Sequence, residues 1–178
     1  MFSPFSNIAS TICKFISSFE RSFIEDCLST SSRGIPVLAD MSIGAFLSEI
    51  ALDSDDVMVF PGGMPGTRNL ASCASLMDMM RKHYMTGGTL AAICAAPSLV
   101  LASKLPADIL SGRSMTCFAG MEEPIISAGA KYVEEGVVED GRLITGRGAG
   151  FCIEFALSIL KHMTDVETAQ KVASSMML

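Results

Sequence analysis

The first 31 residues carry apolar side chains at helical spacing. Large apolar residues recur every three or four positions, which places them on one face of a helix: Phe5, Ile8, Ile12, Phe15, Ile16, Phe19 and Phe23. Pro4 suits the entry into such a helix. The pattern predicts an atypical amphipathic helical extension over residues 1–31, which we expect to pack against the rest of the chain or a second subunit.

From Gly34 onward, short apolar runs alternate with longer stretches of helical periodicity. Strands are predicted at 35–39, 56–60, 89–93 and 113–117, and a hairpin joins 137–138 to 142–145 through an Asp-Gly turn. Helices are predicted at 66–85, after Pro97, at 151–163 and at 166–176. Strands that alternate with helices form a mostly parallel sheet covered on both faces. We therefore expect one α/β domain over residues 32–178.

The composition narrows the classes of function. Of the 178 residues, 49% are hydrophobic and 18% are charged, as in a compact domain with a large core. The net charge of −6 argues against nucleic-acid binding, which needs a basic surface, and no apolar run is long enough for a membrane span. The six cysteines lack metal-site spacing and follow no secretory signal. We therefore expect reduced thiols, no metal and a cytoplasmic location, with organellar targeting by residues 1–31 left open.

Cys94 stands where a strand gives way to a helix, in the sequence Ala-Ala-Ile-Cys-Ala-Ala-Pro. Small residues at 92, 95 and 96 allow a tight turn, as in a nucleophile elbow. The following helix directs unpaired N–H groups and the positive end of its dipole at the sulfur, which favours the thiolate. The pattern predicts a reactive cysteine; the alternative is an ordinary buried cysteine.

The predicted strand 56–60 ends in Pro61-Gly62-Gly63. Such a turn leaves the sheet at its carboxyl edge, where open α/β sheets bind ligands, and glycine lets a backbone N–H face a ligand closely. We expect the N–H groups of Gly63 and Ala95 to hold an oxyanion beside Cys94, with Gly62 in the binding site. The alternative is a turn that needs glycine only for its positive φ.

These motifs resemble the ThiJ/PfpI family, which is the family of the parkinsonism-associated protein deglycase in the class I glutamine-amidotransferase-like superfamily. The resemblance rests on the Pro-Gly-Gly turn, Asn69-Leu70, the Cys94 elbow and segments 139–145, 147–150 and 154–157, in that order over residues 32–173. It implies a flavodoxin-like three-layer α/β/α sandwich. It also implies Cys94 as nucleophile, Gly63 and Ala95 as oxyanion donors, and Arg33 near the site across a dimer contact.

The chain departs from the family pattern in two places. Family members begin with a strand and a glutamate that hydrogen-bonds the cysteine, but nothing before Ile35 matches that strand, so it is missing or replaced by the helix of residues 1–31. Some members carry a histidine where Phe118 stands, and we expect Phe118 to line the binding site. His83 and His162 are expected to be surface-exposed. Loss of general acid–base groups predicts weakened catalysis.

The resemblance implies glyoxalase or deglycase action on methylglyoxal, glyoxal or their protein adducts. We expect no cofactor and a homodimer. The second reading is a non-catalytic redox-sensing or chaperone-like oxidative-stress protein, because oxidation needs only an exposed thiolate. A cysteine peptidase ranks last, since the peptidase branch of the family has a histidine where Ala95 stands.

Overall fold

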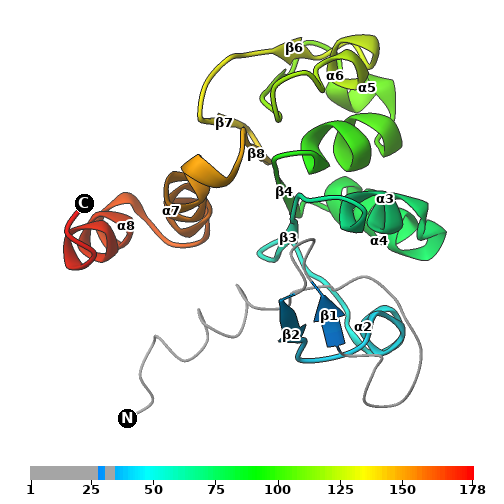
Figure 1. Cartoon of the computed structure of the whole chain (residues 1–178), viewed down its shortest axis with the longest axis horizontal. Helices are drawn as coiled ribbons and strands as arrows, with labels where there is room; N and C mark the ends of the chain where they lie inside the picture. Colours follow the sequence, from blue (N-terminus) through cyan, green and yellow to red (C-terminus); the bar gives the residue numbers. More distant parts are fainter. Residues whose placement is uncertain (1–27, 31–34) are drawn as a thin grey trace.

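A four-stranded sheet forms the centre of the computed structural model, which describes residues 28–30 and 35–178 (Figure 1). The strand order is β3 (Val57–Phe60), β4 (Thr89–Ile93), β8 (Leu143–Gly146), β7 (Val137–Asp140). The first three strands are parallel, and β7 is antiparallel to β8. The register pairs Phe60 with Ala92 and Ile93 with Gly146. The parallel strands therefore end together at one carboxyl edge.

Helices cover both faces of this sheet, so the predicted three-layer α/β/α architecture is confirmed. One face carries α3 (Gly66–Ser72), α4 (Ala74–Met85) and the π-helical η2 (Pro97–Ala102), with α2 (Ile43–Glu49), α5 (Ala107–Leu110) and α6 (Glu123–Ser127) in the same core. The other face carries α7 (Cys152–Met163), and α8 (Val166–Ser175) packs on α7. Figure 1 shows α7 and α8 on the opposite side of the strands from α3 and α4.

The alternation of side chains along β4 explains the two cores. Leu90 and Ala92 belong to the core under α4, whereas Ala91 belongs to the core that also contains Phe155 and Ile159 of α7. Successive side chains of a strand point to opposite faces, and a strand that is apolar on both faces is typical of the middle of a parallel sheet. The β7–β8 hairpin turns at Gly141, whose φ of +59° glycine adopts without strain.

Several predicted elements differ in detail from those observed. Residues 28–30, within the predicted helical extension, form strand β1 (Leu28–Thr30), which pairs antiparallel with the exposed β2 (Pro36–Leu38). The strand predicted at 113–117 is the short β5 (Ser114–Met115), paired with β6 (Lys131–Tyr132) outside the central sheet. The helix predicted at 66–85 is interrupted at Cys73, whose ψ is 96°.

Arg33 lies outside the described residues, as do residues 1–27 and 31 of the predicted extension. Within the part of the chain that the structure describes, β3 is an edge strand of the central sheet.

The expectation that both histidines are exposed is wrong for His83. Its side chain is only 3% exposed, its Nε2 lies 3.0 Å from the Asp56 carbonyl oxygen, and its ring lies against Gly88. The buried Nδ1 has no hydrogen-bond partner among the described residues. His83 continues the row of buried α4 residues that includes Leu76 and Met80, so its helical register decides its burial. His162 is exposed as predicted, with Nε2 2.7 Å from Thr89 Oγ1.

Hydrogen bonds and ring contacts of charged side chains connect the helices and strands to one another. Arg142 Nη1 donates to the carbonyl oxygens of Tyr84 and Gly88 at 2.7 Å each, and its guanidinium lies 4.3 Å from the Tyr84 ring centre. Hydrogen bonds from the Ser114 N–H and the Arg113 guanidinium lower the pKa of Asp140.

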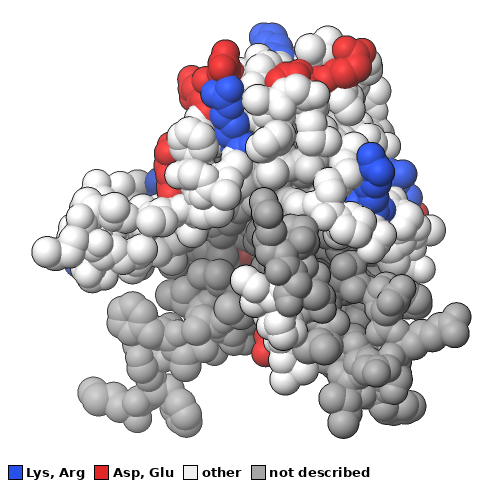
Figure 2. Space-filling view, viewed as in Figure 1, with Lys and Arg blue, Asp and Glu red and all other residues white. Residues whose placement is uncertain are grey.

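On the face in Figure 2, acidic and basic side chains are interspersed and form no broad basic area. No described helix is long and apolar enough to cross a membrane.

Candidate active site

Cys94 directly follows β4 and has a φ of +64°, in the left-handed region that side chains other than glycine seldom adopt. Hydrogen bonds anchor its backbone on both sides: its N–H donates to the Gly146 carbonyl at 2.8 Å, and its carbonyl accepts from the Phe118 N–H at 2.8 Å. Its side chain is partly exposed. Strained backbone of this kind is concentrated at functional sites, so the conformation supports the elbow predicted from the sequence.

We expect the Cys94→Gly variant to be more stable than Cys94→Ala, which reverses the usual order. Alanine keeps a Cβ, at a cost in this conformation of about 1–2 kcal/mol. Glycine is free of that strain and loses only about 0.5–1 kcal/mol through chain entropy. Urea denaturation should therefore favour glycine by roughly 0.5–1 kcal/mol. An alanine variant that is as stable as the glycine variant would show that the turn stores no strain.

The loop after β3 touches the cysteine directly. An ideal Cβ on Gly62 would lie 2.5 Å from Cys94 Cβ and 3.1 Å from Sγ, so only glycine fits there. Gly63 has a φ of +89°. Its carbonyl accepts from the N–H of Thr67 at 2.9 Å and from Oγ1 of the same buried residue at 2.7 Å. These two bonds fix the orientation of the loop beside Cys94.

The N–H groups of Gly63 and Ala95 donate to no residue in the described ranges. Both groups belong to turns next to Cys94, and such unpaired backbone donors are what an oxyanion site requires. Their role as oxyanion donors stays a prediction.

The segment after Cys94 is helical, as predicted, but η2 has π-helical bonding. Ala95 and Ala96 are buried in the turn that leads to it. Ser98, also buried, donates from Oγ to the Met121 carbonyl at 2.5 Å and ties η2 to the loop before α6. π-helical turns are rare and frequently lie at functional sites.

A second cysteine, Cys117, lies near Cys94 but in a different environment. Its side chain is fully buried. Burial raises the pKa of the Cys117 thiol, although a hydrogen bond with Ser98 acts in the opposite direction, and the nearby negative charge of Glu122 raises it further. The pair therefore consists of a partly exposed thiol at the elbow and a buried thiol that resists ionisation.

Phe118 lies beside the elbow, with its N–H bonded to Cys94 and its side chain 52% exposed. A Cβ added to Gly148 would lie 3.7 Å from its ring. On the loop after Phe118, the N–H of Gly120 donates to Glu122 at 2.6 Å and lowers the pKa of that carboxyl. Arg147 is paired with Glu134 at 2.7 Å. The structure thus brings Gly62, Gly63, Ala95 and Phe118 around Cys94, whereas Arg33 lies outside the described residues.

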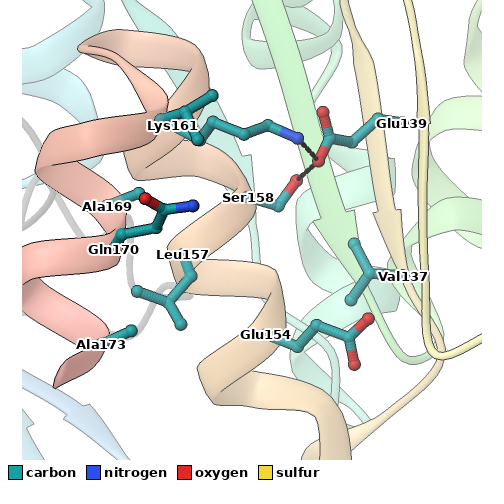
Figure 3. A pocket seen from close by; sticks show the side chains of 10 residues that line it. Val137, Glu139, Glu154, Leu157, Ser158, Lys161, Ala169, Gln170 and Ala173 are labelled. Atoms are coloured by element: carbon teal, nitrogen blue, oxygen red, sulfur yellow. Dashed lines mark hydrogen bonds and ion pairs between the residues drawn. The ribbon is translucent and has the colours of Figure 1, made fainter. Parts of the chain in front are cut away.

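A separate cavity of about 420 Å³ lies between β7, α7 and α8 (Figure 3). Ser158 Oγ and Lys161 Nζ both donate to Glu139 Oε1 there, at 2.7 and 2.6 Å. No cysteine lines the cavity, and the described residues contain no cluster of three side chains able to hold a metal ion. Cys94, in its strained conformation, and the turns around it therefore mark this edge of the sheet as the candidate active site.

Known proteins match most of this chain. A model of the DJ-1/PfpI family matches residues 21–162. Protein dj-1beta of Drosophila melanogaster is 36% identical over 147 residues, which cover 83% of this chain and 74% of the relative. The glutathione-independent glyoxalase DJR-1.2 of Caenorhabditis elegans is 28% identical, also over 83% of this chain and 74% of that protein.

The solved structures agree with the sequence relatives. The crystal structure of Drosophila melanogaster DJ-1beta has a TM-score of 0.75 and 32% identity, and the match covers 86% of this chain and 78% of that one. The fold is accordingly the flavodoxin-like α/β fold that the sequence predicts. From its family match, its relatives and this architecture, the chain belongs to the DJ-1/PfpI family, the ThiJ/PfpI family that the sequence motifs resemble.

Proposed function

We propose that this protein is a cofactor-independent, cysteine-dependent glyoxalase or deglycase that acts on reactive dicarbonyls or their protein adducts. The observation that carries the proposal is the strained Cys94 turn, with a φ of +64°, held against Gly62. A family relative named as a glutathione-independent glyoxalase supports this class of chemistry.

The reaction begins when the Cys94 thiolate adds to the aldehyde carbon of methylglyoxal. The N–H groups of Gly63 and Ala95 stabilise the resulting hemithioacetal oxyanion. A proton then moves from the aldehyde carbon to the neighbouring carbonyl, and water releases lactate and the free thiol. One methylglyoxal and one water together have the atoms of lactic acid, so the reaction needs no external oxidant.

In this scheme, proton transfer is the step that we expect to limit the rate. Phe118, the residue bonded to the Cys94 carbonyl, has no titratable group, and no described acid or base hydrogen-bonds the Cys94 thiol. A positioned acid–base group contributes about 10²–10⁴-fold to such reactions. We therefore propose that turnover is slow. The same observation favours a second candidate, a redox-responsive protein in which Cys94 is oxidised and turns over no carbonyl substrate.

Lactate formation from methylglyoxal tests the proposal, with Cys94→Ser as the variant. We expect turnover by the unmodified protein, loss of turnover in Cys94→Ser, and normal turnover in Cys152→Ser, which removes an exposed cysteine on α7. Equal turnover in Cys94→Ser would overturn the proposal. An absence of lactate together with peroxide-dependent addition of oxygen to Cys94, followed by mass spectrometry, would support the redox candidate instead.

We also propose that the protein is a homodimer. Val37 and Leu38 on β2 are 46% and 70% exposed, and exposed apolar side chains on a two-stranded ribbon favour burial in an interface. Sedimentation equilibrium measures the mass directly, and a monomer at micromolar concentration would contradict this part of the proposal.

A further inference from the structure

Large apolar side chains are exposed in three of the segments that follow strand ends near Cys94. Met64 is 36% exposed on the loop after β3, Phe118 is 52% exposed after β5, and Phe151 is 36% exposed after β8. We call these three residues the apolar rim. Isolated exposed apolar residues are ordinary, but a group of them around a nucleophile resembles the lining of a ligand site.

Contacts and chain neighbours link each member of the rim to the elbow. Gly62, two residues before Met64, lies against Cys94. The Phe118 N–H is bonded to the Cys94 carbonyl at 2.8 Å. A Cβ added to Gly148 would lie 3.7 Å from the Phe118 ring, and the Gly148 carbonyl accepts from the Phe151 N–H at 2.9 Å.

The charges near the rim disfavour an anionic substrate. Arg147, which precedes Gly148, is committed to Glu134 at 2.7 Å. The lowered pKa of Glu122 keeps a negative charge on the loop after Phe118. A substituent with a carboxylate would meet the negative charge of Glu122, whereas an aromatic substituent would find the exposed Phe118 ring to pack on.

We propose that the Cys94 site selects carbonyl compounds that carry an apolar, aromatic substituent over small or carboxylate-bearing ones. This inference rests on the proposed function for its reaction, with an aryl glyoxal as the substrate class. Phenylglyoxal and one water give mandelate, because the aldehyde carbon is oxidised to the carboxylate while the ketone is reduced to the alcohol. No external oxidant or reductant takes part.

Alkylation of the unmodified protein tests the selectivity without requiring turnover. Cys94 is treated with iodoacetamide, N-benzyliodoacetamide and iodoacetate, with N-acetylcysteine in the same solution as the reference for intrinsic reactivity. After this normalisation we expect the benzyl reagent to be preferred over iodoacetamide by about tenfold, and iodoacetate to be the slowest. Equal normalised rates for the three reagents would overturn the inference.

The Phe118→Ala variant assigns the preference to the rim. We expect this variant to lose most of the excess of the benzyl rate over the iodoacetamide rate, and Phe118→Leu, which keeps an apolar side chain, to retain part of it. A full preference in Phe118→Ala would contradict the assignment.

Turnover of phenylglyoxal and methylglyoxal separates this inference from the proposed function. A benzyl preference without turnover of either compound would leave the selectivity standing and reject the glyoxalase. Turnover of both with equal kcat/KM would reject the selectivity alone.

Discussion

We expect the Gly62→Ala variant to lower methylglyoxal turnover by about a hundredfold. The new methyl group would lie 2.5 Å from Cys94 Cβ and 2.8 Å from the Ile93 carbonyl oxygen, far inside van der Waals contact. Because hydrogen bonds to Gly146 and Phe118 hold the elbow on both sides, the loop and the nucleophile must move apart. A misplacement of about 1 Å at a reacting group costs about 10²-fold in rate. Lactate assays and iodoacetamide labelling of Cys94 measure the effect.

Gly150→Ala is the matched control, since its added Cβ would have no neighbour within 4 Å. We expect this variant to keep the turnover and labelling rate of the unmodified protein. If Gly62→Ala also behaves normally, the close contact between the loop and Cys94 does not position the nucleophile.

The second large effect is on stability, in the Gly88→Ala variant. Its new Cβ would lie 2.0–2.3 Å from three atoms of the His83 ring. That ring is only 3% exposed, so it cannot swing into solvent. Overpacking of a buried site costs about 1–3 kcal/mol, and we expect the upper end, with a fall in Tm of about 6–12 °C. Thermal denaturation followed by circular dichroism measures the change.

Gly136→Ala provides a contrast for this prediction. Its Cβ would lie 2.2 Å from the Phe151 ring, which is as close as the clash at Gly88. Phe151 is 36% exposed and can rotate away, so we expect a loss below about 1 kcal/mol. Equal losses in the two variants would show that burial of the displaced ring does not decide the cost.

Elements with a strong local pattern could be predicted from the sequence. β3, β4 and the β7–β8 hairpin lie where the apolar runs and the Asp-Gly turn place them. The sequence pattern of a strand does not identify the strand with which it pairs. This is why the alternation of strands and helices wrongly predicts that β2 and β5 belong to the main sheet. The break at Cys73 carries no glycine or proline, so periodicity alone extends the helix through it.

Some features of the candidate site could likewise be predicted from the sequence, and others could not. Cys94 and the Pro-Gly-Gly loop could be found because their residue types are dictated by local backbone geometry. The supporting roles of Ser98 and Gly146 could not, since their partners are brought to them only by the packing of distant segments. Thr67 is intermediate: its hydroxyl donates to the carbonyl of Gly63, only four residues earlier, so the contact is local, but a threonine in the first turn of a helix does not by itself indicate this bond.

The position of β4 determines how destabilising mutations elsewhere in the molecule affect activity at Cys94. This strand is flanked by β3 and β8, and Cys94 at its end is bonded to two further segments, so Cys94 loses its position only when the sheet itself opens. A mutation far away that weakens the fold will therefore reduce how many molecules are active at a given moment, while each folded molecule works at its full rate. In cells, such variants would be recognised by low protein abundance and normal specific activity.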